Sequence, residues 1–350
     1  MPPTAGNPVT PDQARAVAAL RAGSRFVLAG HVKPDGDCLG AQAALARVLA
    51  ALGKEVWIYN PDAPEAQFDY LAREVRFRVW SGDVLPAHDW TVLLDISELS
   101  RCGPLEPALR AANSRKMVID HHIHDGPVWW DESYVDVRCA ATGLLVRRIA
   151  RELGVELDRG AALGVFTSLV TDTGWFKYSN TDAETLATAA ELVALGLEPA
   201  RLYGSIYQRQ NSELPLALAR SLARMHYHAG RRLAVVDLPR AGAGESELVD
   251  SDLLLDILRS VEAVEVVLFL RETKDGVCKL SARSKTAYDV QKLAKRFGGG
   301  GHAKAAGATI LGSLSDARER LVAAALEDLA VLDAAGARET AARAAVEGAR

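Results

Sequence analysis

The chain has 350 residues, of which 49% are hydrophobic and 25% charged, and its 41 Lys and Arg against 45 Asp and Glu give a formal net charge of −4. That length and composition allow two soluble domains with full cores, and the charge excludes a general electrostatic attraction for nucleic acid. Four scattered cysteines without a CxxC pair, no secretory pattern at the N-terminus and no apolar run of about 20 residues predict a cytoplasmic protein without a membrane span.

Short β-type runs alternate with helical patterns in the first half of the chain, which favours a parallel α/β sheet. We expect strands at 25–29, 56–59, 91–94 and 117–119, and helices at 39–52, 142–153, 161–170 and 182–195. Residues 198–224 have helical patches and few strand signals, so we expect a helical connector there.

A second, smaller α/β domain is predicted from about residue 230 onwards. We expect strands at 233–236, 264–270 and 277–282, the last two joined in a hairpin across 273–276, and helices at 252–260, 290–297 and 315–332. Asp289 can cap the helix at 290–297. The tail after Ala334 is expected to be helical or frayed, and His226 and His228 are expected to have packing or surface roles.

Ionisable side chains follow three of the predicted strands where each strand ends. They are His31, Asp35 and Asp37 after the first strand, Asp95 after the run at 91–94, and Asp120, His121 and His122 after the run at 117–119. In open α/β sheets, sites form outside the carboxyl ends of the strands. Imidazole nitrogens gathered with carboxylate oxygens suit divalent transition metals, and two such metals suit the hydrolysis of phosphate esters.

The carboxylates favour two cations over one. Asp35, Asp37, Asp95 and Asp172 carry four negative charges when ionised, which two divalent cations would balance. Two close cations repel each other, so a shared carboxylate is needed between them, and Asp95 is the expected bridge. A single Asp after a strand is more often a turn or helix cap, but the combined pattern favours a metal site. The donor set suits Mn²⁺, with Mg²⁺, Co²⁺ or Zn²⁺ as alternatives.

A glycine run marks the second domain. Gly298 can end the preceding helix, which leaves Gly299, Gly300 and Gly301 without an explanation. Backbone amides of such residues can approach a phosphate closely, and His302 can donate to the same phosphate. This segment is therefore expected to bind substrate.

A basic strand end lies in the same domain. Arg283, beside Ser284, offers a planar fork for a phosphate. An ordinary exposed edge strand, with Arg283 and Lys285 as basic edge residues, is the alternative. We expect Arg283 and Ser284 to contact substrate.

As a set, these motifs resemble the DHH phosphoesterase superfamily, which includes RecJ exonucleases, type II inorganic pyrophosphatases and small oligoribonuclease/pAp phosphatases (pAp is 3′-phosphoadenosine 5′-phosphate). The matching residues are 31–37, Leu94-Asp95, Asp120-His121-His122, Asp172-Thr173-Gly174 and, in the companion C-terminal domain, 299–302 with 305–307. Length and spacing resemble the NrnA-type bifunctional oligoribonucleases and pAp phosphatases. Cys38 stands where the family more often has Ser, and we expect it to make the site sensitive to oxidation.

The resemblance implies an α/β fold with a parallel-sheet DHH catalytic domain (12–190), a helical connector (191–229), a smaller α/β DHH-associated substrate-binding domain (230–332) and a tail (333–350), with the active-site cleft between the domains. It implies one metal held by His31, Asp35 and Asp95, and the other by Asp37, Asp95, His121 and Asp172. His122 and Asp95 are the expected catalytic residues, and Asp120 is expected to orient a histidine.

The resemblance also implies the reaction: two-metal hydrolysis of short RNA or DNA oligonucleotides to mononucleotides and of pAp to AMP. The alternatives are a cyclic-dinucleotide or pApA-specific phosphodiesterase, a RecJ-like single-strand exonuclease, an inorganic pyrophosphatase, which the glycine run disfavours, and a non-catalytic nucleotide-binding module. Loss of a metal ligand would mark the last of these, and none is missing. A homodimer is compatible with the sequence.

Overall fold

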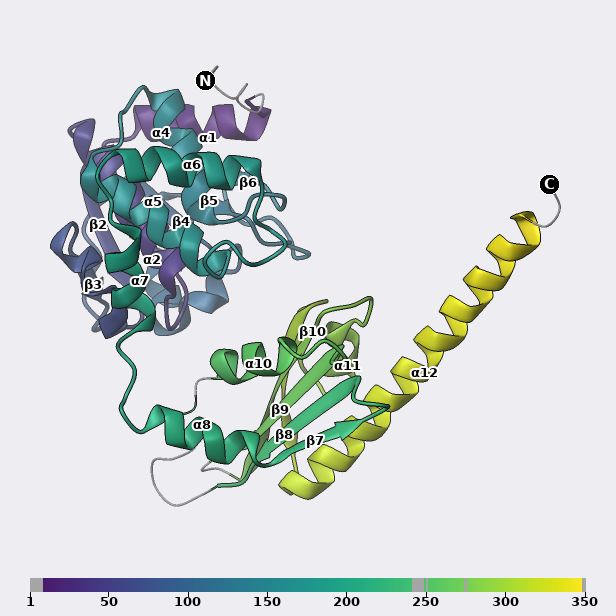
Figure 1. The fold of residues 1–350 in the computed structure, drawn as a ribbon. Helices are drawn as coiled ribbons and strands as arrows, with labels where there is room; N and C mark the ends of the chain where they lie inside the picture. Colours follow the sequence, from purple (N-terminus) through teal and green to yellow (C-terminus); the bar gives the residue numbers. More distant parts are fainter. Residues whose placement is uncertain (1–8, 241–248, 250, 274–275, 348–350) are drawn as a thin grey trace. The chain divides into compact units, whose positions relative to one another are not determined.

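The computed structural model describes residues 9–240, 249, 251–273 and 276–347. The chain divides into two compact units, Met1–Arg209 and Gln210–Arg350 (Figure 1). Within the described part of the chain, no helix combines the length and the apolar composition that a membrane crossing requires.

A six-stranded parallel sheet forms the centre of the first unit. Its strands, in the order β3-β2-β1-β4-β5-β6, are β1 Arg25–Ala29, β2 Glu55–Asn60, β3 Phe77–Val79, β4 Trp90–Leu94, β5 Arg115–Asp120 and β6 Glu132–Val135. The chain builds outward from β1 to β3, and then returns to the other side of β1 with β4. This reversal between β1 and β4 is where open parallel sheets form their ligand sites.

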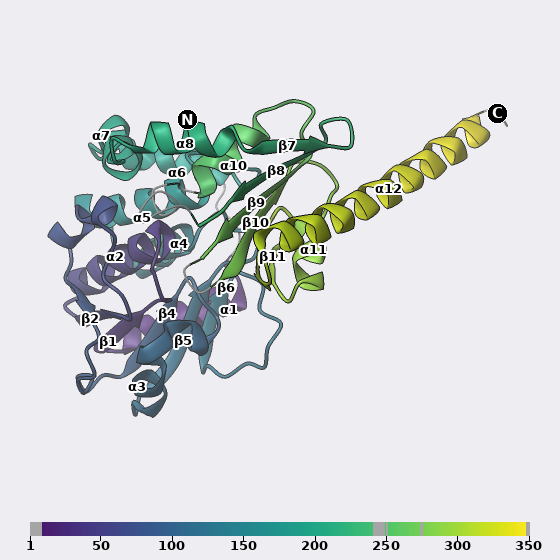
Figure 2. The same cartoon turned by 90° about the horizontal axis from the view of Figure 1, so that it is seen from below.

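Helices cover both faces of this sheet (Figure 2). They are α1 Pro11–Ala22, α2 Gly36–Ala51, α3 Glu106–Ala111, α4 Thr142–Leu153, α5 Arg159–Asp172, α6 Ala183–Ala194 and α7 Pro199–Tyr207, with short 3-10 turns at Ala66–Phe68, Leu71–Arg73 and Leu99–Leu105. Phe26 and Leu28 point to the core shared with α1, α2, α4 and α5. Val27 and Ala29 point to the opposite face, which α3 and the turn at Leu99–Leu105 cover. Because side chains alternate along β1, this one strand contributes to the cores on both faces of the sheet.

Two glycines let α2 and α5 approach backbone to backbone. A Cβ atom added to Gly40 would lie 2.4 Å from the carbonyl oxygen of Gly164, and one added to Gly164 would lie 2.6 Å from the carbonyl oxygen of Gly40. No larger residue fits at either position without moving the helices apart. The contact matters for function because Asp37 and Asp172 lie on these two helices.

The second unit contains a mixed sheet in the order β11-β12-β10-β9-β8-β7. Its elements are α8 Leu214–Leu222, β7 Met225–His228, β8 Leu233–Leu238, α10 Ser251–Arg259, β9 Val266–Glu272, β10 Val277–Ser284, α11 Val290–Arg296, β11 Gly300–His302, β12 Ala305–Leu311 and α12 Leu314–Glu347. One face of the sheet packs on α11 and α12, and the other on α8 and α10.

The predicted fold class is confirmed: a parallel α/β unit precedes a smaller α/β unit. β9 and β10 pair antiparallel as the hairpin prediction requires, although Lys274 and Asp275 of its turn lie outside the described residues. Asp289 caps α11 by accepting hydrogen bonds from the amides of Gln291 and Lys292. The tail is helical as far as Glu347, because α12 continues without a break to that residue.

Other segments differ from the expectation. His226 and His228, placed in the connector by the sequence, lie on β7, which pairs with β8 in the second sheet. The helices α1 and α3, the strand β12 and the short strands β3, β6 and β11 had no expected counterpart. The edge strands β3, β6 and β11 are only three or four residues long, too short for an alternating pattern to be recognised.

Candidate metal centre

The carboxyl ends of three neighbouring strands bring the first candidate ligands together. His31 lies just past β1, Asp95 directly follows β4, and His121 directly follows β5. Because β1 and β4 are adjacent where the strand order reverses, His31 and Asp95 meet there, with Nε2 of His31 3.5 Å from Oδ2 of Asp95. Asp95 has a φ of 65°, in the left-handed region that Asp and Asn tolerate better than most residues.

Helix ends supply the other carboxylates. Asp35 is the N-cap of α2, and its Oδ1 accepts hydrogen bonds from the backbone amides of Asp37 and Cys38. Asp37 lies in the first turn of the same helix, where the helix dipole favours negative charge. Asp172 is the last residue of α5. Two helices therefore bring three acidic side chains to the carboxyl edge of the sheet.

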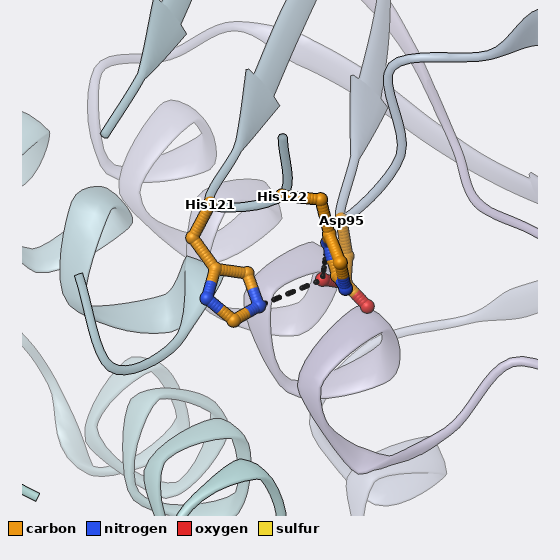
Figure 3. Close-up of side chains that lie close together, drawn as sticks. All are labelled: Asp95, His121 and His122. Carbon is orange, nitrogen blue, oxygen red and sulfur yellow. Dashed lines mark ion pairs between the residues drawn. The ribbon is translucent and has the colours of Figure 1, made fainter. Parts of the chain in front are cut away.

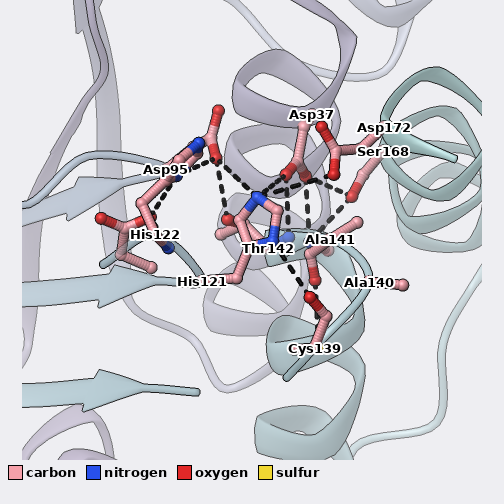
Figure 4. Close-up of polar contacts among 12 residues, drawn as sticks. Asp37, Asp95, His121, His122, Cys139, Ala140, Ala141, Thr142, Ser168 and Asp172 are labelled. Atoms are coloured by element: carbon pink, nitrogen blue, oxygen red, sulfur yellow. Dashed lines mark hydrogen bonds and ion pairs between the residues drawn. The ribbon is translucent and has the colours of Figure 1, made fainter. Parts of the chain in front are cut away.

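The structure gathers the charged residues into three overlapping groups that could each hold a metal ion: the two sets defined next, and a group of Asp95, His121 and His122. The first set is His31, Asp35 and Asp95, and the second set is Asp37, His121 and Asp172; in each, one ligand atom per residue lies within 4.8 Å of the others. The Oδ2 atom of Asp95 lies 3.5 Å from His31 Nε2, and its Oδ1 atom lies 3.5 Å from His121 Nε2. Asp95 therefore spans the two sets, as a bridging ligand would. Figure 4 shows the Asp95 carboxylate beside His121 of the second set.

In His31 and His121, one ring nitrogen makes a supporting hydrogen bond and the other is available to coordinate a metal ion. Nδ1 of His31 lies 2.9 Å from the carbonyl oxygen of Val32, and Nδ1 of His121 lies 3.0 Å from that of Cys139. Because a carbonyl oxygen only accepts, each Nδ1 carries a proton, and in the neutral ring each Nε2 keeps a lone pair. That lone pair is what a metal ligand needs.

The surroundings of His121 Nε2 fit a cation. This atom is buried and has no hydrogen-bond partner among the described residues. It lies 3.4 Å from Asp37 Oδ2 and 3.7 Å from Asp172 Oδ2. Two atoms that are each about 2.1 Å from one metal lie about 3.0–3.4 Å apart at octahedral or tetrahedral angles. The 3.4 Å between His121 and Asp37 therefore suits two ligands of a common divalent cation, and the 3.7 Å to Asp172 is slightly longer than this range.

The pKa values of the cluster shift because its charges are buried together. Burial and the neighbouring charge of Asp95 raise the pKa of Asp37, and burial raises the pKa of Asp172 to about 6. Burial opposes protonation of His121, but Asp95 and Asp37 outweigh it and raise its pKa to about 11. Burial also disfavours the charge on Asp95, yet His121 and His31 hold the pKa of Asp95 well below its usual range. Without cations, bound protons therefore offset part of the negative charge.

His122 has a different environment. Its Nδ1 lies 2.8 Å from Oδ1 of Asp120, and its backbone amide donates to the same oxygen. Oδ2 of the fully buried Asp120 accepts a hydrogen bond from Ser97 at 2.6 Å. Figure 3 shows the His122 ring beside Asp95. This arrangement fixes the ring and directs Nε2 away from Asp120, as an acid that contacts substrate would require.

Two protein family models match the chain. Residues 25–197 match the DHH family, N-terminal domain, and residues 247–330 match the DHHA1 domain. A Thermus thermophilus protein named "Bifunctional oligoribonuclease and PAP phosphatase NrnA" is 37% identical over 86% of this chain and 89% of its own length. The chain belongs to the DHH phosphoesterase family.

Solved structures share the fold. An exopolyphosphatase-related protein from Bacteroides fragilis has a TM-score of 0.81 at 23% identity, over 91% of this chain and 95% of that one. RecJ from Thermus thermophilus, solved in complex with Mn²⁺, has a TM-score of 0.53 at 20% identity, over 93% of this chain and 56% of RecJ. Both likenesses support the α/β architecture predicted for this DHH family chain.

Sequence reasoning missed three hydroxyl residues that hold the candidate ligands. Thr142 Oγ1 donates to Asp95 at 3.1 Å, Ser168 Oγ donates to Asp37, and Ser97 donates to Asp120. Single serines and threonines form no motif, so only the fold reveals Ser97 and Thr142. Ser168 is one helical turn before Asp172 on α5, and that spacing could have indicated a shared face.

Cys38 does not have the environment expected of an oxidation-sensitive thiol. Its side chain is completely buried, and Sγ lies 3.8 Å from the carbonyl oxygen of Leu94. Burial, followed by the negative charges of Asp95 and Asp35, raises the pKa of the thiol well above its ordinary value. Burial and the raised pKa both suppress the reactive thiolate, which argues against the oxidation sensitivity expected from the sequence.

The predicted substrate contacts of the second unit differ in their accessibility. Arg283 donates to Asp252 Oδ1 at 2.6 Å, and its guanidinium remains partly exposed. Ser284 is only 2% exposed and donates to the carbonyl oxygen of Tyr288 at 2.7 Å. Ser284 thus stabilises the turn after β10, and a direct contact with substrate would require that turn to open.

Packing explains more of the glycine run than the sequence indicated. A Cβ atom on Gly299 would lie 2.1 Å from the carbonyl oxygen of Gly307, and one on Gly301 would lie 2.5 Å from that of Ala305. Gly300 meets no such obstacle, and Gly300–His302 forms the edge strand β11 beside β12. Close strand pairing therefore accounts for Gly299 and Gly301, and phosphate binding by this segment stays a prediction.

Proposed function

We propose that this chain is a metal-dependent phosphoesterase that hydrolyses short oligonucleotides to mononucleotides and pAp to AMP. The observation that carries the proposal is the position of Asp95 between two sets of ligands, one with His31 and the other with His121. The 37% identity to a relative named as a bifunctional oligoribonuclease and PAP phosphatase supports the choice of substrates. One site can serve both, because each reaction breaks the bond between phosphorus and a 3′ oxygen.

We propose two divalent cations, with Mn²⁺ as the first choice. His31, Asp35 and Asp95 would hold one, and Asp37, Asp95, His121 and Asp172 the other. Such cations, when bound, supply Lewis-acid activation of the phosphoryl group and of a water molecule. The buried carboxylates alone would repel an anionic substrate, so binding of the phosphate requires their charge to be balanced.

The chain's own residues supply orientation and a proton. Asp120 fixes the ring of His122 through Nδ1, and Ser97 fixes Asp120. His122, whose side chain is 31% exposed, would donate a proton from Nε2 to the leaving 3′ oxygen. This role requires a raised pKa, and contacts with Asp120 and Asp95 raise the pKa of His122 despite burial, which lowers it.

In this proposal, Arg283 and the segment Gly300–His302 of the second unit grip a terminal phosphate of the substrate. Arg283 is held in place by Asp252, and its fork can make two parallel hydrogen bonds to a phosphate. Binding of one end of the substrate would supply energy that positions the reacting bond at the other end. This would favour substrates of a few nucleotides.

The test is a substrate panel with Mn²⁺: pAp, pApA, 5′-phosphorylated RNA and DNA from dimers to pentamers, a long single strand and pyrophosphate. We expect turnover of pAp and of the short oligomers, with the rate falling as length increases. Preference for the long strand would favour a RecJ-like exonuclease, and activity on pApA without pAp would favour a cyclic-dinucleotide pathway enzyme. Absence of turnover on every substrate would refute the proposal.

A further inference from the structure

Asn180 is a polar side chain that contacts Asp172 from outside the second set. Its Nδ2 donates to the backbone carbonyl oxygen of Asp172 at 3.1 Å and lies 3.4 Å from the carboxylate oxygen Oδ2 of the same residue. It also donates to the carbonyl oxygen of Ala140 at 3.1 Å. One amide group thus connects the end of α5 with the loop that precedes α4.

That loop also supports His121. Ala140 follows Cys139, whose carbonyl oxygen lies 3.0 Å from Nδ1 of His121 (Figure 4). Asn180 therefore bears on two members of the second set, directly on Asp172 and through two adjacent carbonyl groups on His121. Its hydrogen bonds reach neither His31 nor Asp35 of the first set.

A strained turn brings Asn180 back to Asp172. Gly174, Trp175 and Phe176 have successive φ angles of 54°, 61° and 66°, all in the left-handed region. A non-glycine residue there costs about 1–2 kcal/mol, so the surrounding structure must hold Trp175 and Phe176 in place.

Aromatic packing holds this turn. The ring centroid of Trp175 lies 6.1 Å from that of Phe166 on α5 and 5.0 Å from that of Tyr203 on α7, both edge to face. Such pairs contribute about 0.5–1.5 kcal/mol each beyond the burial of their area. The aromatic contacts therefore hold the strained turn in one conformation. This in turn fixes the position of Asn180.

We propose that Asn180 is a positioning residue that sets the affinity of the second set, Asp37, His121 and Asp172, for its cation and leaves the first set unaffected. The proposal rests on the two-metal site proposed above. Partners that orient metal ligands typically change metal affinity by about 10–100-fold when they are removed.

The experiment is a Mn²⁺ titration followed by electron paramagnetic resonance of the free ion. It compares the wild-type protein with Asn180→Ala and with Asn180→Leu, which keeps a similar volume, adds no charge and loses the donor. Ser179→Ala, at an exposed neighbouring position, is the matched control. Asp35→Asn and Asp172→Asn identify which class of bound ion belongs to which set.

We expect two classes of Mn²⁺ in the wild-type protein, and one class weakened by about 10–100-fold in both Asn180 variants. The weakened class should be the one that Asp172→Asn removes, and the class that Asp35→Asn removes should be unchanged. The double variant with Asp172→Asn should lose little more than the single variants, because the two residues act together.

Equal weakening of both classes, or no change in either, would overturn the role of Asn180. Thermal unfolding in EDTA distinguishes misfolding from a loss of positioning. If Asn180 only positions metal ligands, the Asn180 variants should have metal-free melting temperatures close to that of Ser179→Ala. A wild-type protein that binds no Mn²⁺ would instead refute the metal site itself.

Discussion

The backbone amide of Thr142 donates a hydrogen bond to Oδ2 of Asp37 at 2.9 Å. Thr142 is the first residue of α4, and the N-cap residue of that helix, Ala141, has no side chain that could accept this bond. A candidate metal ligand from α2 thus caps a helix that is distant in sequence. The same hydrogen bond therefore stabilises the fold and holds a candidate metal ligand in place.

The first prediction concerns Asp95. Replacing Asp95 by Asn removes the charge that links the two ligand sets, and we expect turnover of pAp to fall by about a thousandfold or more. Asn is preferable to Ala because it tolerates the φ of 65° at this position. Steady-state kinetics with Mn²⁺ provide the measurement, with the exposed Asp69→Asn as control. Retention of near wild-type rates would contradict the bridging role.

A second prediction tests the contact between α2 and α5. Gly164→Ala would place a Cβ atom 2.6 Å from the carbonyl oxygen of Gly40, and we expect the free energy of unfolding to fall by about 1–3 kcal/mol. Gly204→Ala on α7 is the matched control, because its Cβ would meet only the end of Gln208 at 3.4 Å. That change should be neutral or stabilising by about 0.5–1 kcal/mol. Equal effects in urea denaturation would show that the helices are not in the close contact described.

The third prediction concerns pH. A cation that binds the second set must displace the proton of His121, whose pKa without metal is raised to about 11, and below about pH 6 also that of Asp172. Burial and Asp95 also raise the pKa of Asp37, so its proton adds to the number displaced. Metal affinity should therefore rise with pH, more steeply below pH 6 than above it. Calorimetry at pH 7 in two buffers of different ionisation enthalpy should detect proton release on Mn²⁺ binding. Affinity that is independent of pH would contradict His121 as a ligand.

Thiol chemistry provides a fourth prediction. All four cysteines are buried, and burial raises the pKa of Cys102 and of Cys139 to about 12. We expect Ellman's reagent to leave the folded protein unmodified and fully active, and to react with every thiol after denaturation in guanidinium. Rapid loss of activity in the native state would restore the original expectation for Cys38.

The fifth prediction addresses substrate binding by the second unit. Arg283→Lys keeps the charge but loses the planar fork, so we expect KM for short 5′-phosphorylated oligomers to rise by about tenfold with a smaller change in kcat. Arg296→Lys, which also replaces an arginine paired with acidic residues, is the control. An unchanged KM would favour the alternative in which Arg283 is an ordinary edge residue.

The sequence was sufficient to place three of the candidate metal ligands at the ends of strands. His31, Asp95 and His121 each follow an apolar run, and period and position together predicted the strand ends where they lie. The helix at 142–153 was predicted with the bounds of α4, which Gly154 ends in a left-handed conformation.

The remaining features depend on contacts between distant residues. The bond from Thr142 to Asp37 and the approach of Gly40 to Gly164 have no local pattern. The same holds for Gly299 and Gly301, where the sequence pointed to phosphate and the structure provides a second reason in the pairing with β12. Tertiary packing thus changes how a glycine run is interpreted.

The candidate ligands come from segments between His31 and Asp172, so an unfolded chain could not hold a cation as the folded one does. Binding would therefore stabilise the fold by an amount that grows with the logarithm of free metal concentration. In a cell short of that cation, proteases would meet a larger unfolded fraction of this chain. The amount of enzyme, and not only its rate, would then follow metal supply.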